Sequence, residues 1–181
     1  MHKGLLMDTQ TRICKQARTE FSVLKGSDLP LSGRALVELL RAVLQKGVPV
    51  RFQARGFSMD PFIKNKDLVT VSPFQGDRAG LGDILAFVHP ETQGLCVHRI
   101  VRKKGDLYVT RGDNRSENDE RVPQESILGF VTGVQRDGKQ VFLGLGPERF
   151  LIAFLGRRGI LFPLLFPLWR IVRPFMRRPA R

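Results

Sequence analysis

A serine with apolar neighbours stands in the segment GFSM, residues 56–59, where a stretch of alternating apolar and polar residues ends. A packed position would favour an aliphatic residue, and a solvated turn would favour more polar neighbours. A serine hydroxyl becomes a nucleophile when a nearby base removes its proton, and a neutral imidazole can do this near pH 7. His98, in the apolar stretch VHRIV, is the candidate base. We therefore take Ser58 and His98 as a candidate catalytic pair.

Carboxylates are the next requirement, because an imidazole works better as a base when a carboxylate holds its tautomer and stabilises the imidazolium. Asp113 and Asp119 are the candidates, and both lie in the polar segment RGDNRSENDERV, residues 111–122. This segment follows two short apolar stretches that Lys104-Gly105 would join as a hairpin turn. The sequence therefore places hydroxyl, imidazole and carboxylate groups at or near strand ends.

Each of these residues also has an ordinary structural interpretation. A lone serine in a loop is most often a turn residue, a single histidine on a strand is most often structural, and Asp113 between glycine and asparagine suits a β-turn. A metal site is a further alternative, since His89, Cys96 and His98 lie close in sequence. No second pair has recognised ligand spacing, so we expect no metal and no other cofactor.

The elements that must position these groups form one domain with tails. Residues 32–46 show apolar residues at helical spacing, with Ser32 as a candidate N-cap, and predict an amphipathic helix. From residue 48 the period changes to two, and at least six strands are expected within residues 48–145, with a turn at Asp137-Gly138. We predict a mainly β domain over residues 32–146, preceded by a loosely ordered arm at 1–31.

Positive charge is concentrated at the C-terminal end of the chain. The net charge is +13, and residues 148–181 hold eight arginines and one glutamate among Phe, Leu, Ile and Trp169. This mixture fits an anionic membrane surface at least as well as a phosphate backbone, and DNA binding by the tail stays an alternative. The longest uncharged apolar run, residues 159–169, is too short to span a bilayer and contains two prolines. We interpret residues 147–181 as a basic, apolar tail. Within it, residues 159–169 are expected to be either an interfacial or re-entrant segment or a helix docked on the domain.

Cysteine usage and the N-terminal residues bear on the compartment. Cys14 and Cys96 are too few for a disulfide framework, which favours a reducing compartment. The apolar patch near the start is too short for the core of a secretory signal. We therefore expect a cytoplasmic, membrane-associated protein.

The order of the motifs resembles that of a known peptidase superfamily. GFSMDPFI, Asp67 in KDLVTV, GDILAF, VHRIV, RGDNRSENDERV and ILGFV are similar to the successive motifs of type I signal peptidases and LexA-like self-cleaving repressors. The likeness covers about half of the chain, from Val48 to Val134. In bacterial signal peptidases and the repressors the base is a lysine, whereas His98 stands here. The chain thus resembles the Ser-His branch, that of the endoplasmic-reticulum and archaeal signal peptidases.

The resemblance implies a fold, an activity and roles for four residues. The fold would be a twisted, mostly antiparallel β assembly, and the activity serine endopeptidase cleavage of a peptide or precursor protein. Ser58 maps to the nucleophile and His98 to the general base. Asp119 maps to the acidic residue that supports the histidine, and Asp113 to the aspartate of the Gly-Asp-Asn turn.

Two departures leave alternatives open. Signal peptidases usually carry a hydroxyl residue two positions before the nucleophile, to help bind the oxyanion, and Gly56 stands there. They also hold the domain at the membrane by an N-terminal transmembrane helix, which we do not find. One alternative is a peptide-binding module that keeps the fold without turnover. The other is a LexA-like regulator, for which we would expect a helix-turn-helix and a self-cleavage site before the serine.

Overall fold

A computed structural model describes residues 33–74, 79–115 and 120–161 of the 181-residue chain. The N-terminal arm, Ser32, Cys14, Asp119 and the segment from residue 162 onward lie outside the described residues. In chain order the elements are α2 (Gly33–Gln45), β1 (Val50–Gln53), β2 (Leu68–Pro73), β3 (Ile84–Val88), β4 (Leu95–Lys104), β5 (Leu107–Arg111), β6 (Glu120–Pro123), the 3-10 turn η1 (Gln124–Ser126), β7 (Ile127–Arg136), β8 (Lys139–Val141) and α3 (Arg149–Arg157).

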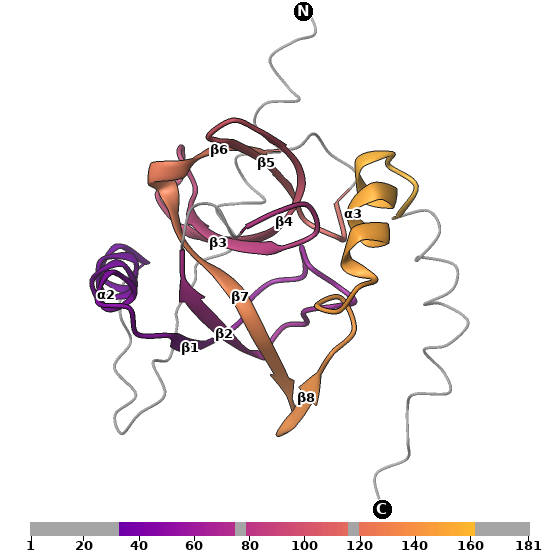
Figure 1. The fold of residues 1–181 in the computed structure, drawn as a ribbon. Coiled ribbons are helices and arrows are strands. Elements are labelled where there is room, and N and C mark those ends of the chain that lie inside the picture. The colour runs from indigo at the N-terminus through magenta and orange to yellow at the C-terminus, as the bar shows by residue number, and fades with distance from the viewer. Residues whose placement is uncertain (1–32, 75–78, 116–119, 162–181) are drawn as a thin grey trace, which may run out of the picture.

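The domain is mainly β, as the sequence predicts, and its strands form one curled half-barrel sheet. The strand order is β1-β2-β7-β3-β4-β5-β6, with β8 paired to β7, and every pairing is antiparallel. Register shifts in the β2–β7, β3–β7 and β4–β5 pairs are local irregularities of the kind that bend strands and increase twist. Figure 1 shows β7 crossing the middle of this curled sheet.

Two turns show how local sequence shapes the sheet. Asp137 and Gly138 join β7 to β8 with φ angles of 51° and 76°, which suits a two-residue hairpin turn with both central residues left-handed. Gly105 has a φ of 58° at the turn between β4 and β5. The first turn lies at the predicted residues. The second is centred on Gly105 and Asp106, one residue later than the predicted Lys104-Gly105, because Lys104 still pairs with Leu107.

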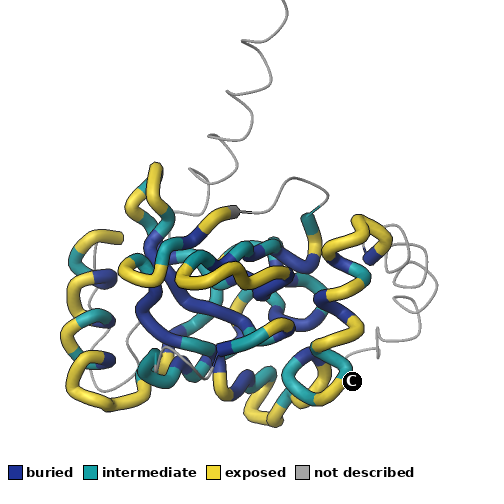
Figure 2. Tube along the Cα trace, turned by 45° about the horizontal axis from the view of Figure 1, so that its top comes forward, coloured by how far each residue is buried: buried dark blue, intermediate teal, exposed yellow. Residues whose placement is uncertain are grey.

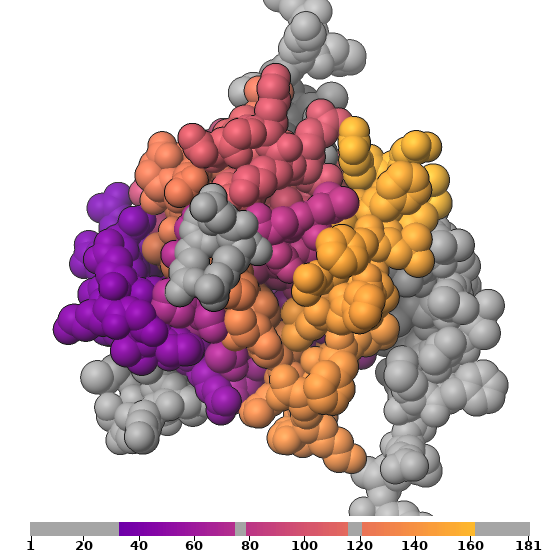
Figure 3. All heavy atoms as spheres, viewed as in Figure 1, coloured from indigo at the N-terminus to yellow at the C-terminus, as the bar shows by residue number. Residues whose placement is uncertain are grey.

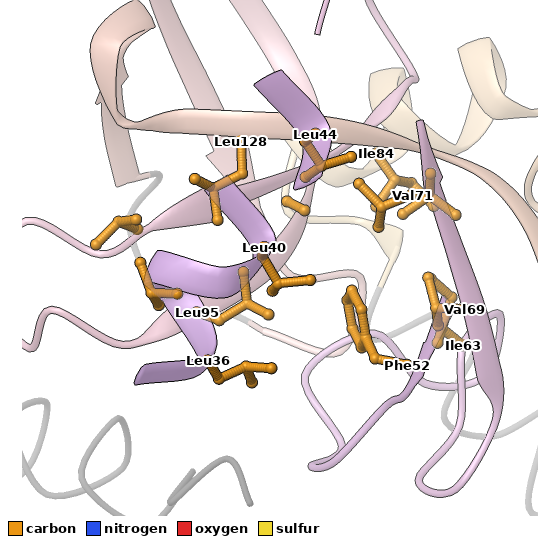
Figure 4. Close-up of a cluster of buried hydrophobic side chains, with 14 of the residues drawn as sticks. Leu36, Leu40, Leu44, Phe52, Ile63, Val69, Val71, Ile84, Leu95 and Leu128 are labelled. Carbon is orange, nitrogen blue, oxygen red and sulfur yellow. The ribbon is translucent and has the colours of Figure 1, made fainter. Parts of the chain in front are cut away.

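The leading helix α2 packs on the sheet through the apolar face expected from its periodicity. Leu36, Leu40 and Leu44 are buried in a core cluster that also includes Phe52 of β1. Figure 4 shows these side chains with Ile63, Val69, Val71, Ile84, Leu95 and Leu128. Figure 2 shows buried residues concentrated along the strands at the centre of the domain. This core stabilises the sheet, and the strands and loops of the sheet carry the candidate site.

A second helix, α3, lies within the segment that the sequence analysis assigned to the tail. Figure 1 places α3 and α2 on opposite sides of the sheet. Ile152 of α3 forms a small core cluster with Phe62 and Leu161, and α3 contacts β4. The described part of residues 147–181 therefore includes a helix that packs on the domain.

Candidate active site

Ser58 lies in the loop between β1 and β2, partly exposed to solvent. The loop is held by short-range hydrogen bonds. The Asp60 N–H donates to the Phe57 carbonyl at 3.2 Å, and the Gly56 N–H donates to Asn65 Oδ1 at 3.2 Å. The next residue, Met59, is buried in the main core cluster. Ser58 is thus presented at the surface by a loop that is anchored on both sides.

His98 lies in β4 and meets Ser58 across a long sequence separation. Its side chain is almost fully buried, its ring packs edge to face on Phe87 at 6.0 Å between centroids, and β4 pairs it with Leu85. The Nε2 atom lies 3.3 Å from Ser58 Oγ, within hydrogen-bonding distance, although the two residues are 40 apart in sequence. The structure therefore brings the predicted nucleophile and the predicted base together.

Asp113 follows β5 and binds Arg99 rather than His98. Arg99 Nε donates to Asp113 Oδ1 at 2.8 Å and Nη2 donates to Oδ2 at 2.7 Å, in a pair that is almost fully buried. Burial raises the pKa of Asp113 above its ordinary value, and the charge and hydrogen bonds of Arg99 oppose that rise. The charge of Asp113 also interacts favourably with a protonated His98. Asp113 can therefore stabilise an imidazolium at a distance without orienting it directly.

The turn that contains Asp113 is also hydrogen-bonded to the loop that carries Ser58. The Asn114 N–H donates to the Ser58 carbonyl at 2.8 Å, and Asn114 Nδ2 donates to the Phe57 carbonyl at 3.1 Å. Gly112 lies so close that a Cβ atom there would be 2.7 Å from the Ser58 carbonyl oxygen. These contacts fix the two peptide groups on either side of the candidate nucleophile.

That arrangement determines where backbone donors point. In a trans peptide the N–H points away from the carbonyl of the same group, so binding the Phe57 carbonyl directs the Ser58 N–H away from Asn114. Within the described residues the Ser58 N–H has no hydrogen-bond acceptor. It is therefore a candidate donor for a developing oxyanion. Gly56, where the resemblance to signal peptidases would lead us to expect a hydroxyl residue, has a φ of 103°, which residues with side chains rarely adopt.

Arg99 is the residue of this region that the sequence analysis did not assign. Besides Asp113, its Nη1 donates to the carbonyls of Gly82 and Gly144, both at 2.8 Å. Its guanidinium also lies over the Phe62 ring, 5.4 Å from the centroid. The sequence contained one signal for such a buried ion pair, namely an arginine inside the apolar stretch VHRIV. A buried strand position tolerates an arginine only when its charge is paired.

The alternative metal residues do not converge. His89 Nδ1 accepts hydrogen bonds from the N–H groups of Glu91 and Thr92, both at 3.2 Å, and so belongs to a turn. Within residues 33–74, 79–115 and 120–161, no three His, Cys, Asp or Glu side chains are grouped as metal ligands would be. The third predicted member of the catalytic set, Asp119, lies outside the described residues.

No protein-family model matches the chain, and searches of curated proteins and of solved structures found no significant match. In the described part of the chain, none of the helices has the length and apolar character needed to cross a bilayer. The candidate site is therefore interpreted from its own geometry, together with the resemblance of its motifs.

Proposed function

We propose that the protein is a serine endopeptidase of the signal peptidase type, with Ser58 as nucleophile and His98 as general base. The observation that supports this most directly is the 3.3 Å approach of Ser58 Oγ to His98 Nε2. This distance is slightly longer than the best catalytic hydrogen bonds, as is common without substrate. A partly exposed hydroxyl beside a buried imidazole is the arrangement that acyl transfer requires.

The proposed reaction uses the hydroxyl and N–H of Ser58, the imidazole of His98 and two aspartates. His98 takes the proton of the Ser58 hydroxyl as Oγ attacks the scissile carbonyl carbon, and the oxyanion that forms accepts a hydrogen bond from the Ser58 N–H. The imidazolium then gives its proton to the leaving amine, the carbon–nitrogen bond breaks and an acyl-enzyme remains. A water molecule, deprotonated by His98, then attacks the acyl carbon. The ester bond to Ser58 Oγ breaks, the acid product leaves and the imidazolium returns its proton to Oγ. Asp113 favours the charged imidazolium electrostatically, and Asp119 is proposed to support His98 as the resemblance implies.

The substrate class that fits is an extended peptide or precursor protein. β1 lies at one edge of the sheet, pairs with β2 on one side, and leads directly into the Ser58 loop. An extended chain that added to such an edge would gain backbone hydrogen bonds while its scissile bond approached Ser58. The basic, apolar C-terminal region is proposed to bring the enzyme to a membrane surface where precursors are presented.

Active-site acylation tests the proposal. The full chain is incubated with a β-lactam or lipopeptide inhibitor of signal peptidases, digested, and mapped by mass spectrometry. We expect an adduct on Ser58 that is lost in Ser58→Ala and slowed at least about a hundredfold in His98→Ala. Ser72→Ala and His89→Ala serve as matched controls, because both residues are partly exposed and lie outside the site.

Two outcomes would redirect the proposal. An adduct on Ser58 that forms equally fast in His98→Ala would remove histidine as the base. A folded protein that binds peptides but gives no adduct would instead support the non-catalytic peptide-binding module, with Gly56 as the position where a second oxyanion donor is missing.

A further inference from the structure

Helix α3 is apolar on the side that faces the domain and on the side that faces away from it. Ile152, Ala153 and Gly156 are buried against the domain. On the outward side Phe150, Leu151 and Phe154 are 49%, 59% and 49% exposed. A helix that is hydrophobic all round is normally covered on every side. We call these three exposed residues the α3 face.

Further apolar side chains flank this helix in the chain. Phe142 and Leu143, just after β8, are 75% and 64% exposed, and Ile160, after the helix, is 47% exposed. The orange-to-yellow region of Figure 3 shows that this C-terminal part of the domain forms one side of the molecule. Exposed apolar residues that recur within one short part of the chain make this part a candidate interaction surface.

The charged residues of α3 and of the turn after it are all arginines, of which Arg149 is paired with Asp83 at 3.4 Å. Residues 149–161 contain three arginines and no acidic residue. Arg149 lies over the Phe150 ring and Arg158 over the Phe154 ring, each 5.0 Å from the centroid, and Arg157 is exposed at the end of the helix. The sequence that follows, residues 162–181, adds five arginines and again no acid. Aromatic and cationic groups are therefore adjacent on the same helix.

We propose that the α3 face is a docking surface for an anionic lipid bilayer. An interfacial helix needs aromatic and leucine side chains that enter the acyl boundary and arginines that bind anionic headgroups, and α3 with its neighbours offers both. The segment 162–181 is a less suitable cover, because its charged residues are all arginines, as are those of residues 149–161. A second copy packed symmetrically on the same face would bring identical arginines together.

Such docking would also position the candidate active site. Arg111 donates a hydrogen bond through Nη1 to the Gly156 carbonyl of α3, and the next residue, Gly112, abuts Ser58. The C-terminal end of α3 and the serine loop are thus attached to the same strand end. The lipid proposal does not require Ser58 to be a nucleophile, and its test makes no use of activity.

A tryptophan reporter distinguishes the α3 face from the rest of the chain. Trp169 is the only tryptophan, so the full chain carrying Trp169→Phe and Phe154→Trp reports α3 alone, with Trp169→Phe and Val48→Trp as the control. Val48 is 51% exposed and precedes β1. On adding vesicles of phosphatidylcholine and phosphatidylglycerol we expect a blue shift and quenching by brominated acyl chains at position 154 only. Neither change should occur with phosphatidylcholine alone.

Vesicle flotation of full-length variants provides the second measurement. Phe150→Ser with Phe154→Ser, and separately Arg157→Ala with Arg158→Ala, should each lower partition into anionic vesicles about tenfold or more. Leu39→Ser with Val48→Ser and Arg102→Ala with Lys104→Ala are matched controls that change exposed residues elsewhere and should leave partition unchanged.

Three results would overturn the proposal. If the chain floats with anionic vesicles while the tryptophan at position 154 stays unshifted, the lipid contact lies elsewhere, such as in residues 162–181. An emission already blue-shifted without lipid and unaffected by vesicles would mean that protein covers α3, and sizing by light scattering would separate a second copy from the chain's own segment. Equal binding to neutral and anionic vesicles would exclude the headgroup contribution.

Discussion

Arg99 and Asp113 form a bidentate ion pair whose side chains are 0% and 3% exposed, directly beside the candidate catalytic histidine. Asp113 belongs to the turn that binds the serine loop, and Arg99 follows His98 in β4. The pair therefore connects the strand that carries the candidate base to the turn that holds the candidate nucleophile. The same arginine binds the carbonyls of Gly82 and Gly144, so four separate segments meet at one guanidinium.

Breaking this pair should destabilise the protein strongly. Asp113→Asn leaves the buried guanidinium without its counter-charge, and we expect the free energy of unfolding to fall by about 3–5 kcal/mol in urea denaturation. Arg149 and Asp83 provide a matched control, because that pair lies 3.4 Å apart and is partly exposed. Asp83→Asn should cost less than about 1 kcal/mol at this pair. Similar losses at both sites would show that the Arg99 pair is not special.

Gly112→Ala should disturb the serine loop. The added Cβ atom would lie 2.7 Å from the Ser58 carbonyl oxygen, and backbone cannot yield as a flexible side chain can. We expect a loss of about 1–3 kcal/mol of stability and an acylation rate reduced by about a hundredfold. Gly80→Ala is the control, since nothing lies within 4 Å of a Cβ there and its φ is not left-handed. Wild-type acylation by Gly112→Ala would refute the close approach.

Asn114→Ala should slow acylation more than it lowers stability. The change removes the hydrogen bond from Nδ2 to the Phe57 carbonyl but keeps the backbone bond to Ser58. Because Asn114 is exposed, we expect the midpoint of urea unfolding to change little. The rate of Ser58 acylation at saturating inhibitor should fall about tenfold or more, since the Ser58 N–H loses its fixed direction. A fall in stability with an unchanged rate would identify Asn114 as merely structural.

Glu148 should make stability depend on pH in the acid range. Its Oε1 accepts hydrogen bonds from the N–H groups of Gly144 at 2.7 Å and Gly146 at 3.1 Å. The hydrogen bond from its own backbone N–H, and then those from Gly144 and Gly146, lower the pKa of Glu148 below the ordinary 4.5. A carboxylate with a lowered pKa in the folded state stabilises the protein above its unfolded pKa, and this contribution is lost as the pH falls through the folded pKa.

The comparison with Glu148→Gln isolates that contribution. The glutamine can accept a hydrogen bond but carries no charge, so the difference in free energy of unfolding between wild type and variant should shrink as the pH is lowered below about 4.5. Urea denaturation at several pH values between about 3 and 7 measures this. A constant difference across the range would show that the Glu148 charge does not contribute.

The fold class could be predicted because its signals are local. Alternation of apolar and polar residues indicates strands, and the Asp137-Gly138 and Lys104-Gly105 pairs indicate turns, since each depends on neighbours within a few residues. The strand order could not be read in the same way. β2 pairs with β7, which lies about sixty residues later, and that choice depends on which apolar faces pack together.

Helix α3 shows a different limit. Residues 149–157 are apolar on both sides and basic at the end, so their pattern resembles that of an interfacial tail as much as that of a docked helix. In the tertiary structure Ile152 is buried against Phe62, so one side of the helix packs on the domain, while Phe150, Leu151 and Phe154 on its other side stay exposed. The contacts of Arg99 could not be predicted from the sequence either. No local sequence pattern relates this residue to Gly82, Asp113 and Gly144, which it binds in the structure.

For the candidate site, the sequence by itself determined the chemical groups: a serine between apolar residues, a histidine in an apolar strand and a polar segment rich in aspartates. Residue type sets what a side chain can donate, accept or attack. Only the tertiary structure decided that Ser58 and His98 meet, that Asp113 binds Arg99, and that Asn114 orients the serine loop. Those relationships join residues far apart in the chain, and they depend on how a curled sheet brings its strand ends together.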